Sequence, residues 1–267
     1  MRIHLMTDLE GVAGVVNHYD YCRPESRYYE QARALLTAEV NAAVDGFFAG
    51  GATDVVVFDG HGPGAVNCEL LDERAKFSRG HYSPIWPWGL DDGFDAFAII
   101  GQHAKSGTPY SHLTHTGAFS VYDLSVNGLS IGEYGTLVLC AKELGIPAIF
   151  AAGEKAFAEE AEALTPGVVT VAVKRGLRPD DGHAHATPEE YSKAKLSAEH
   201  LTPAAARKKI RAGAKLAVER LRDNPKQFRH PDLKAPWHII RRFRPLNVGL
   251  IQHAKDDKSF IAALNKL

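Results

Sequence analysis

The segment Ile-His-Leu-Met-Thr-Asp-Leu-Glu-Gly at residues 3–11 runs from an apolar stretch directly into two carboxylates. The apolar part, residues 3–7, predicts a buried strand that begins almost at the first residue. Asp8 and Glu10 are two positions apart, and side chains two apart on a strand point to the same face. Both carboxylates should therefore converge at the carboxyl end of the strand, where open α/β sheets bind ligands. Two like charges held together there require a cation or a shared proton.

Strand-like and helix-like patterns alternate from this segment to about residue 173. The predicted strands are 3–7, 54–58, 96–100, 148–152 and 168–173, and the predicted helices are 28–49, 133–144 and 154–164. Asn127-Gly128 separates two short strand-like runs, 121–126 and 129–131, and this dipeptide is typical of a tight hairpin. Alternating strands and helices imply right-handed crossovers. The sequence therefore predicts an α/β fold with a mostly parallel sheet and helices on both faces.

The composition changes after about residue 175. Residues 175–200 are polar and rich in Pro, His and Glu, and we interpret them as a loop or irregular excursion. Beyond them the patterns predict a helix at 203–222, strands at 237–240 and 248–251, and a helix at 257–267. We therefore expect a larger domain at 1–175 and a smaller α/β module at 176–267, which would shape the pocket and mediate oligomerisation.

Composition and charge exclude several classes of protein. The 267 residues carry a formal net charge of −1 with a pI near 6.9, so nothing favours a general nucleic-acid or membrane-surface binder. No run approaches the roughly 20 apolar residues of a membrane span. The cysteines Cys22, Cys68 and Cys140 show no paired spacing, which favours free thiols in a reducing compartment. The first strand begins where a signal peptide would stand, so we expect a cytoplasmic protein.

Three predicted strands end in residues that can bind a metal ion. Asp8 and Glu10 follow the first strand, His61 the second and His103 the third, and Glu133 begins the helix after the hairpin. Carboxyl ends of parallel strands lie on one edge of a sheet, so these side chains can meet there. Carboxylates and imidazoles without a thiolate suit zinc or manganese. Five ligands, three of them acidic, fit a pair of metal ions about 3.5–4 Å apart that share one carboxylate.

Each of these residues also has an ordinary interpretation. A single His after a strand is commonly a hydrogen-bonded loop residue, and Asp8 alone could cap a helix. The set is more informative than its members because four candidates fall on the same topological edge.

Other polar and aromatic segments lie close to this edge in the predicted topology. In the loop Thr-Pro-Tyr-Ser-His-Leu-Thr-His-Thr at 108–116, His112 or His115 could act as a general base or stabilise an oxyanion. The same loop could instead be a polar connection held by His–hydroxyl hydrogen bonds. The run Trp86-Pro87-Trp88 could line a substrate pocket or form a rigid packed loop. Neither phosphate-binding glycine motif follows the first strand, so the glycines there are expected to provide tight turns.

Together these motifs resemble those of the DppA-type D-aminopeptidases, a family of dinuclear zinc peptidases. Asp-Leu-Glu-Gly-Val-Ala-Gly at 8–14 is similar to the opening Asp-x-Glu-Gly-(Ile/Val)-x-Gly of that family. Further similar segments follow in the same order up to about residue 175. They are Asp-Gly-His-Gly at 59–62, Gly-Gln-His-Ala-Lys at 101–105, Thr-Pro at 108–109, Leu-Thr-His-Thr at 113–116, Asn-Gly at 127–128, Gly-Glu-Tyr-Gly at 132–135 and Ala-Gly at 152–153.

The resemblance implies a catalytic domain at 1–175 that binds two Zn²⁺ ions per subunit. The implied zinc ligands are Asp8, Glu10, His61, His103 and Glu133. Asp8 would bridge the two ions, and His115 would be catalytic, as a nucleophile or as an acid/base. The resemblance also implies a Rossmann-like domain joined to a smaller α/β domain. The subunits would form a ring-like homo-oligomer, with a decamer as the expected form.

The chain differs from the family pattern in three places. The loop before His115 is one residue longer, which makes His112 a second candidate for its role. The His-rich segment at 180–198 resembles an insertion, and the strand pair near 237–251 is abbreviated.

We therefore expect a zinc-dependent aminopeptidase or amidase acting on short peptides or aminoacyl amides. The sequence leaves open whether the substrates contain D- or L-residues. One alternative is another dinuclear metal hydrolase, acting on a non-peptide amide or a phosphoester. Phosphoester chemistry favours Lys or Arg at the sheet edge, where Lys105 is the obvious candidate. The other alternative is a non-catalytic module that binds a metal ion as part of a larger assembly.

Overall fold

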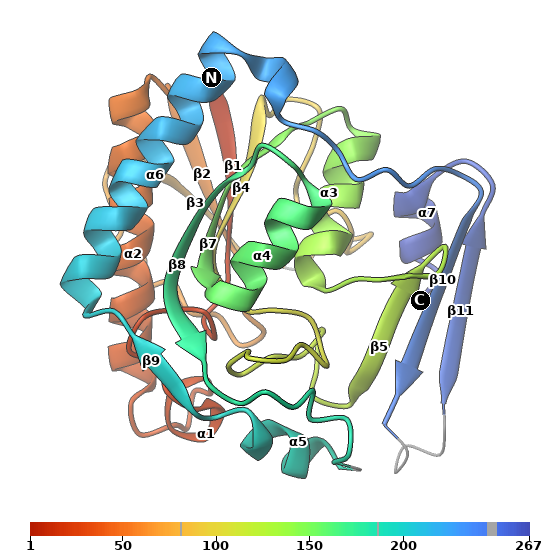
Figure 1. Cartoon of the computed structure of the whole chain (residues 1–267). Coiled ribbons are helices and arrows are strands. Elements are labelled where there is room, and N and C mark those ends of the chain that lie inside the picture. The colour runs from red at the N-terminus through yellow and green to blue at the C-terminus, as the bar shows by residue number, and fades with distance from the viewer. Residues whose placement is uncertain (81, 186, 245–249) are drawn as a thin grey trace.

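The computed structural model describes residues 1–80, 82–185, 187–244 and 250–267, and contains two sheets (Figure 1). The larger sheet has seven strands in the order β3-β2-β1-β4-β7-β8-β9. These strands are β1 (Arg2–Thr7), β2 (Asp54–Asp59), β3 (Lys76–Ser78), β4 (Ala96–Gln102), β7 (Ala148–Glu154), β8 (Val169–Gly176) and β9 (Ala198–His200). Every neighbouring pair is parallel except β8 and β9, which are antiparallel. The predicted mostly parallel α/β sheet is confirmed.

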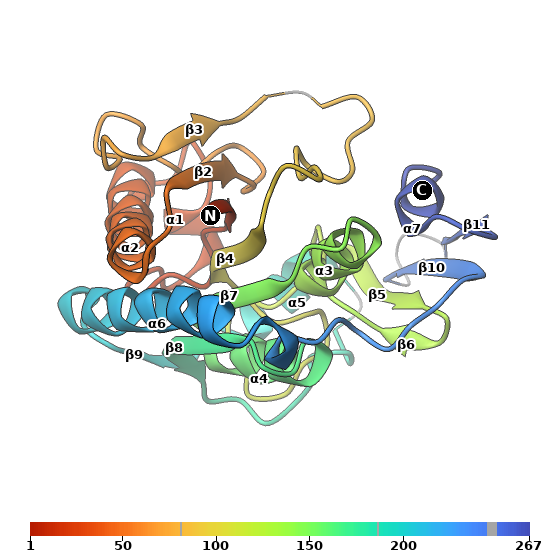
Figure 2. The ribbon, with the colours of Figure 1, turned by 90° about the horizontal axis from the view of Figure 1, so that it is seen from above.

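Helices cover both faces of this sheet (Figure 2). One face carries α2 (Tyr29–Gly50) and α6 (Pro203–Asp223), and the other carries α3 (Glu133–Glu143) and α4 (Lys155–Leu164). In β1, Ile3 and Leu5 belong to the core under α2 and α6, whereas Met6 belongs to the core under α3 and α4. Both faces of the strands are therefore buried, which explains why these strands are apolar throughout rather than alternating.

The smaller sheet is antiparallel, with the strand order β11-β10-β5-β6. Its elements are β5 (Val121–Val126), β6 (Leu129–Ser130), β10 (Trp237–Phe243) and β11 (Ile251–Asp256), and it packs against α7 (Phe260–Leu264). The predicted hairpin between β5 and β6 is confirmed. Asn127 and Gly128 have φ angles of 51° and 86°, the left-handed conformations that a two-residue type I′ turn requires.

Helix α3 belongs to the cores of both sheets. Tyr134 and Val138 pack in the core between α3 and the larger sheet. Leu139 and Cys140, on another side of the helix, pack in the core of the smaller sheet. The two sheets are therefore joined through one shared helix.

The C-terminal third differs from the sequence-based expectation. The interpretation of 175–200 as irregular is wrong, since this segment contains α5 (Pro188–Ala194) and β9. Thr187 and Glu190 form a capping box at the start of α5, a local signal that stabilises helix starts. The strand predicted at 248–251 instead begins at Ile251; positions 248 and 249 lie outside the described residues. The last helix is shorter than predicted because Ser259 caps it.

The two sheets are not built from two consecutive segments of the chain. Strand β9 and helix α6, which follow residue 175, belong to the larger sheet and its covering layer, while β5 and β6, which precede it, belong to the smaller sheet. The division at residue 175 stays a prediction. The short elements α1 (His18–Tyr21) and η1 (Pro225–Gln227) complete the fold. Among the described helices, none combines the length and apolar character needed to cross a lipid bilayer.

Candidate metal centre

The five predicted ligands come from four segments that meet at one edge of the larger sheet. Asp8 and Glu10 lie in the turn after β1, His61 follows β2, and His103 follows β4. Glu133 is the first residue of α3. Four of the five side chains are nearly completely buried, and Glu133 is partly buried.

The turn after β1, rather than the strand itself, brings the two acidic residues together. As predicted, β1 ends at Thr7, so the alternation of side chains along a strand does not extend to Asp8 and Glu10. The turn is anchored by two backbone hydrogen bonds, from the N–H of Asp8 to the carbonyl of Ile100 (2.9 Å) and from the N–H of Gly11 to the carbonyl of Gly101 (2.6 Å). Gly101 has a φ of +74°, and a Cβ there would lie 2.0 Å from the carbonyl oxygen of Asp8. A glycine is required for the two loops to touch.

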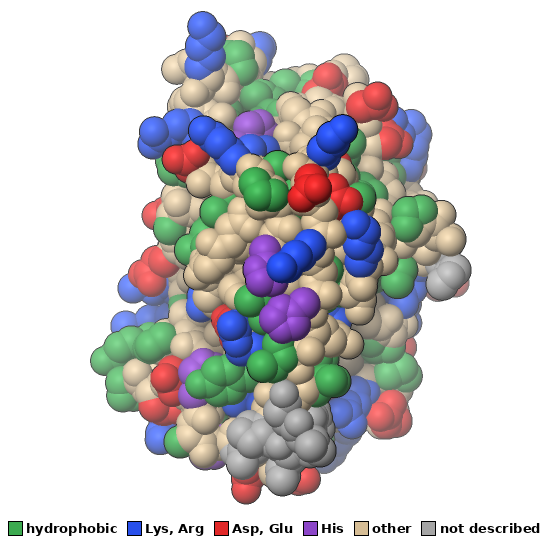
Figure 3. All heavy atoms as spheres, turned by 90° about the vertical axis from the view of Figure 1, so that its right-hand side faces the viewer, with side chains coloured by type: hydrophobic (Ala, Val, Ile, Leu, Met, Phe, Trp, Pro, Cys, Tyr) green, Lys and Arg blue, Asp and Glu red, His purple; other side chains and the backbone are tan. Residues whose placement is uncertain are grey.

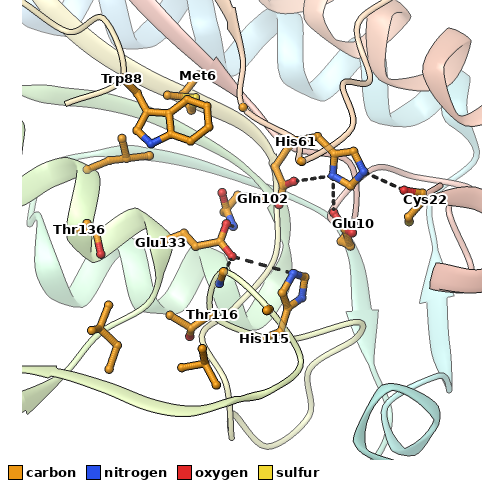
Figure 4. Close-up of a pocket in the computed structure, with 18 of the residues that line it drawn as sticks. Met6, Glu10, Cys22, His61, Trp88, Gln102, His115, Thr116, Glu133 and Thr136 are labelled. Atoms are coloured by element: carbon orange, nitrogen blue, oxygen red, sulfur yellow. Dashed lines mark hydrogen bonds and ion pairs between the residues drawn. The ribbon is translucent and has the colours of Figure 1, made fainter. Parts of the chain in front are cut away.

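The carboxylate of Asp8 lies between two imidazoles. Its Oδ1 is 3.3 Å from Nδ1 of His61, and its Oδ2 is 3.2 Å from Nε2 of His103. Oε2 of Glu10 is 3.2 Å from the same nitrogen of His61, and Oε1 of Glu133 is 3.5 Å from the same nitrogen of His103. The five residues therefore form two groups that share Asp8, and Figure 4 shows Glu10 with His61 on one side and Glu133 on the other.

Backbone carbonyls orient the imidazole rings. Nε2 of His61 donates to the carbonyl of Cys22 (2.9 Å), and Nδ1 of His103 donates to the carbonyl of Ala104 (2.9 Å). A carbonyl can only accept, so the other nitrogen of each ring has no proton in the neutral form and faces the carboxylates. Histidines that bind metals are commonly oriented by such an outer hydrogen bond.

Several buried polar atoms in this cluster lack a hydrogen bond to any residue of the described chain. They are Oδ2 of Asp8, Oε2 of Glu10 and Nε2 of His103. Buried polar atoms without partners are costly, and natural proteins rarely leave them so. A cation among these oxygen and nitrogen donors would satisfy all of them, and the donor set is one that zinc accepts.

The cluster also strongly perturbs the protonation of its members. Burial disfavours charge on His61 and His103, but the neighbouring carboxylates outweigh it. Glu10 and Asp8 raise the pKa of His61 to about 12, and Glu133 and Asp8 raise the pKa of His103 well above its usual value. Burial likewise opposes charge on Glu133, but His103 lowers its pKa to about 2. The site thus favours ionised Glu10 and Glu133 balanced by positive charge, which protons or metal ions can supply.

Of the two candidate histidines in the 108–116 loop, His115 reaches the cluster. Its ring stacks on His103 with centroids 4.0 Å apart, and its Nε2 lies 3.9 Å from Oε1 of Glu133. Its Nδ1 donates to the carbonyl of Leu113 (2.9 Å), so Nε2 is the nitrogen available to a reactant. Burial, followed by the charge on His103, lowers the pKa of His115. His112 is buried elsewhere, with Nε2 3.1 Å from the carbonyl oxygen of Val16.

Three further groups support the cluster and were not expected from the sequence. Nε2 of Gln102 donates to Oε2 of Glu133 (3.2 Å), and the N–H of Gly117 donates to its Oε1 (2.7 Å). Nδ1 of His18 lies 3.4 Å from Oε1 of Glu10. Of these three groups, only Gln102 had a signal in the local sequence, because it is a polar residue at the end of an otherwise apolar strand.

A cavity of about 620 Å³ opens beside the cluster. Its lining includes Glu10, His61, His115 and Glu133 together with Trp86 and Trp88, so the aromatic run lines the pocket as well as packing against the core. Lys105 is not among the lining residues; its Nζ donates to Oγ of Ser130 (3.0 Å). The cation that the sequence suggested for phosphoester chemistry therefore does not line this cavity.

Comparisons with known proteins match most of the chain to one family. A family model described as D-aminopeptidase, Peptidase_M55, matches residues 1–244. A D-aminopeptidase of Bacillus subtilis (strain 168) is 31% identical over 179 residues, which are 66% of this chain and 65% of that protein. The matched region thus spans just under two thirds of the relative's length.

A solved structure shares the fold. It is described as the Zn-dependent D-aminopeptidase DppA from Bacillus subtilis, a self-compartmentalizing protease. It superposes with a TM-score of 0.81 at 22% sequence identity, over 100% of this chain and 95% of that chain. Because the family model covers most of the sequence, the chain belongs to the Peptidase_M55 family of D-aminopeptidases.

Proposed function

We propose that this chain is a zinc-dependent D-aminopeptidase that releases the N-terminal residue of short peptides or aminoacyl amides. The observation that carries the proposal is the position of Asp8, whose two carboxylate oxygens face Nδ1 of His61 and Nε2 of His103. Family membership and the zinc dependence of the solved relative support the choice of metal and reaction.

We assign the five clustered residues as ligands of two zinc ions per subunit. Glu10 and His61 would hold one ion, His103 and Glu133 the other, and Asp8 would bridge them. When bound, such a pair activates a water molecule and polarises the scissile carbonyl. The outer hydrogen bonds to Cys22, Ala104 and Gln102 would fix the orientation of the ligands.

His115 is assigned the proton transfer. Its Nδ1 is committed to the carbonyl of Leu113, which fixes the ring and leaves Nε2 facing the cavity beside Glu133. At Nε2 it would accept a proton from the attacking water and donate it to the leaving amine as the C–N bond breaks. The apolar wall with Trp86 and Trp88 would exclude water from the side chain of the substrate.

We also propose that the protein acts as a homo-oligomer, as the description of the solved relative as self-compartmentalizing suggests for that protein. Strand β11 is an edge strand of the smaller sheet, and Ile251 at its start and the preceding Leu250 are each 49% exposed. The unpaired backbone groups of an edge strand can pair with another chain. Light scattering after size-exclusion chromatography tests this assignment, and a monomer at micromolar concentration contradicts it. The decamer stays a prediction.

The experiment that tests the reaction combines metal analysis with paired substrates. The purified protein should contain about two zinc ions per chain and hydrolyse D-aminoacyl amides and dipeptides faster than their L-counterparts. Dialysis against a chelator should abolish activity, and zinc should restore it. Activity that survives full removal of metal would falsify the proposal. Hydrolysis of phosphoesters alone, or zinc binding without turnover of any substrate, would favour the two alternative interpretations.

A further inference from the structure

Arg241 is a cation on an otherwise apolar face of β10. Side chains of a strand alternate between its two faces, so Trp237, Ile239 and Arg241 share one face. Trp237 and Ile239 are buried in the core of the smaller sheet. Arg241 continues the same face and lines the cavity beside Leu124, its neighbour on β5. Arg241 therefore belongs to the wall of the candidate active site.

The charge of Arg241 has no acidic partner in the described chain. Its Nη1 donates to Oε1 of Gln252 (3.3 Å), and no carboxylate forms an ion pair with it. Burial lowers its pKa, and no neighbouring acid opposes that effect. The adjacent Arg242 is different: it points to the opposite face, where its Nη1 lies 3.0 Å from Oδ2 of Asp123.

The outer face of the smaller sheet, opposite to the face that carries Arg241, is where polar and charged side chains are found. Figure 3 views the side of the molecule formed by β10, β11 and α7, where basic, acidic, histidine and hydrophobic side chains are interspersed. On that outer face, Nε2 of His238 lies 3.2 Å from Nδ1 of His253. Charged residues of β10 are thus expected at the outer surface, whereas a charge on the inner face needs a partner that enters the cavity.

The other cation that lines the cavity is already engaged. Arg23 is exposed, its Nε donates to Nε2 of His18 (3.1 Å), and its guanidinium lies over the ring of Tyr19. It stands on the Glu10 side of the site, next to Cys22. Arg241 is therefore the better candidate for binding a substrate anion.

We propose that Arg241 binds the C-terminal carboxylate of the substrate, so that the enzyme selects very short peptides with a free carboxyl end. The inference rests on the proposed aminopeptidase function, in which the N-terminal end lies at the metal site. A guanidinium binds a carboxylate through two parallel hydrogen bonds, and a partly desolvated site strengthens them. A cavity of about 620 Å³ has the size of sites that enclose small ligands rather than extended chains.

The test compares a D-aminoacyl-glycine dipeptide with its C-terminal amide, using the zinc-loaded full-length protein. The wild type should cleave the dipeptide with a kcat/KM about tenfold or more above that of the amide, mainly through KM, because a hydrogen-bonded charge contributes that much. Arg241→Gln should lose this preference, because its kcat/KM should fall much more with the dipeptide than with the amide. Arg242→Gln is the matched control and should keep the wild-type preference.

Several results would overturn the assignment. They are equal rates of the wild type with both substrates, an equal loss with both substrates in Arg241→Gln, or loss of the preference in Arg23→Gln instead. Arg241→Lys keeps the charge without the two-point contact and should give an intermediate preference, which preserves the test if the Gln variant does not fold. A wild type that cleaves neither substrate, with zinc bound, refutes the proposed function itself rather than the role of Arg241.

Discussion

The buried Glu39 should make the folded protein less stable as the pH rises from 5 to 8. This residue lies inside α2 and is 1% exposed. Its Oε1 accepts a hydrogen bond from the N–H of Ala13 (3.0 Å), and its Oε2 has no hydrogen-bond partner among the described residues. Burial raises its pKa to about 8, and the bond from Ala13 and the charge of Lys174 offset only part of that effect. Glu39 thus supports the loop after β1 in its protonated form.

The sign and size of the effect follow from linkage. The pKa of Glu39 is about 8 in the folded state against an ordinary value of 4.5, so the folded protein holds a proton that the unfolded chain releases. The contribution of Glu39 to the free energy of unfolding is therefore fully present below pH 4.5 and is lost as the pH rises towards 8. Between pH 5 and pH 8 the free energy of unfolding should fall by on the order of 3 kcal/mol from this residue.

Urea unfolding of the metal-free protein at pH 5 and pH 8 measures this difference. Glu39→Gln replaces the protonated acid by a neutral group of the same shape. Its stability should match the wild type near pH 5 and exceed it at pH 8. Glu30→Gln, an exposed position at the start of the same helix, should retain the wild-type pH dependence. Parallel pH profiles for the wild type and Glu39→Gln would refute the reasoning.

Three other predictions concern the site and its support. His115→Ala should lower kcat by at least about 100-fold with unchanged zinc content by elemental analysis, as expected for loss of an acid/base; loss of zinc would instead make it a ligand. Gly101→Ala should unfold at lower urea concentration than Gly145→Ala and bind less zinc, because both have left-handed φ angles but only Gly101 contacts Asp8. Phe150→Ala should cost about 3–5 kcal/mol in urea unfolding, since the ring is fully buried under α2 and α6; a change below 1 kcal/mol would contradict this packing.

The sequence was most informative where a side chain that can bind a metal ion directly follows a strand. The apolar runs before Asp8, His61 and His103 are buried on both faces, so their pattern identified strands, and the parallel topology then placed the strand ends together. Glu133 was found because it opens a helix directly after a recognisable hairpin. The clustering of these side chains at one edge of the sheet was therefore predictable from local patterns plus one topological rule.

The remaining features depend on contacts between distant segments. Strand β9 has three residues and was missed because it is recognisable only by its pairing with β8. The approach of His18 to Glu10 and the selection of His115 over His112 depend on how the loops fold over the sheet edge. Arg241 lay beyond the predicted end of its strand at residue 240, so the alternation that places it on the inner face was not visible.

Helix α3 makes the geometry of the site a property of two separate structural units. Glu133 is carried by this helix, whereas Asp8, Glu10, His61 and His103 follow strands of the larger sheet. A small rigid shift of the smaller sheet against the larger one would be transmitted through α3 to Glu133 alone. Replacing residues on β10 can thus change which substrates are accepted while the four candidate ligands on the larger sheet keep their positions. Substitutions at Leu139 or Cys140, which pack in the core of the smaller sheet, can displace the fifth, Glu133.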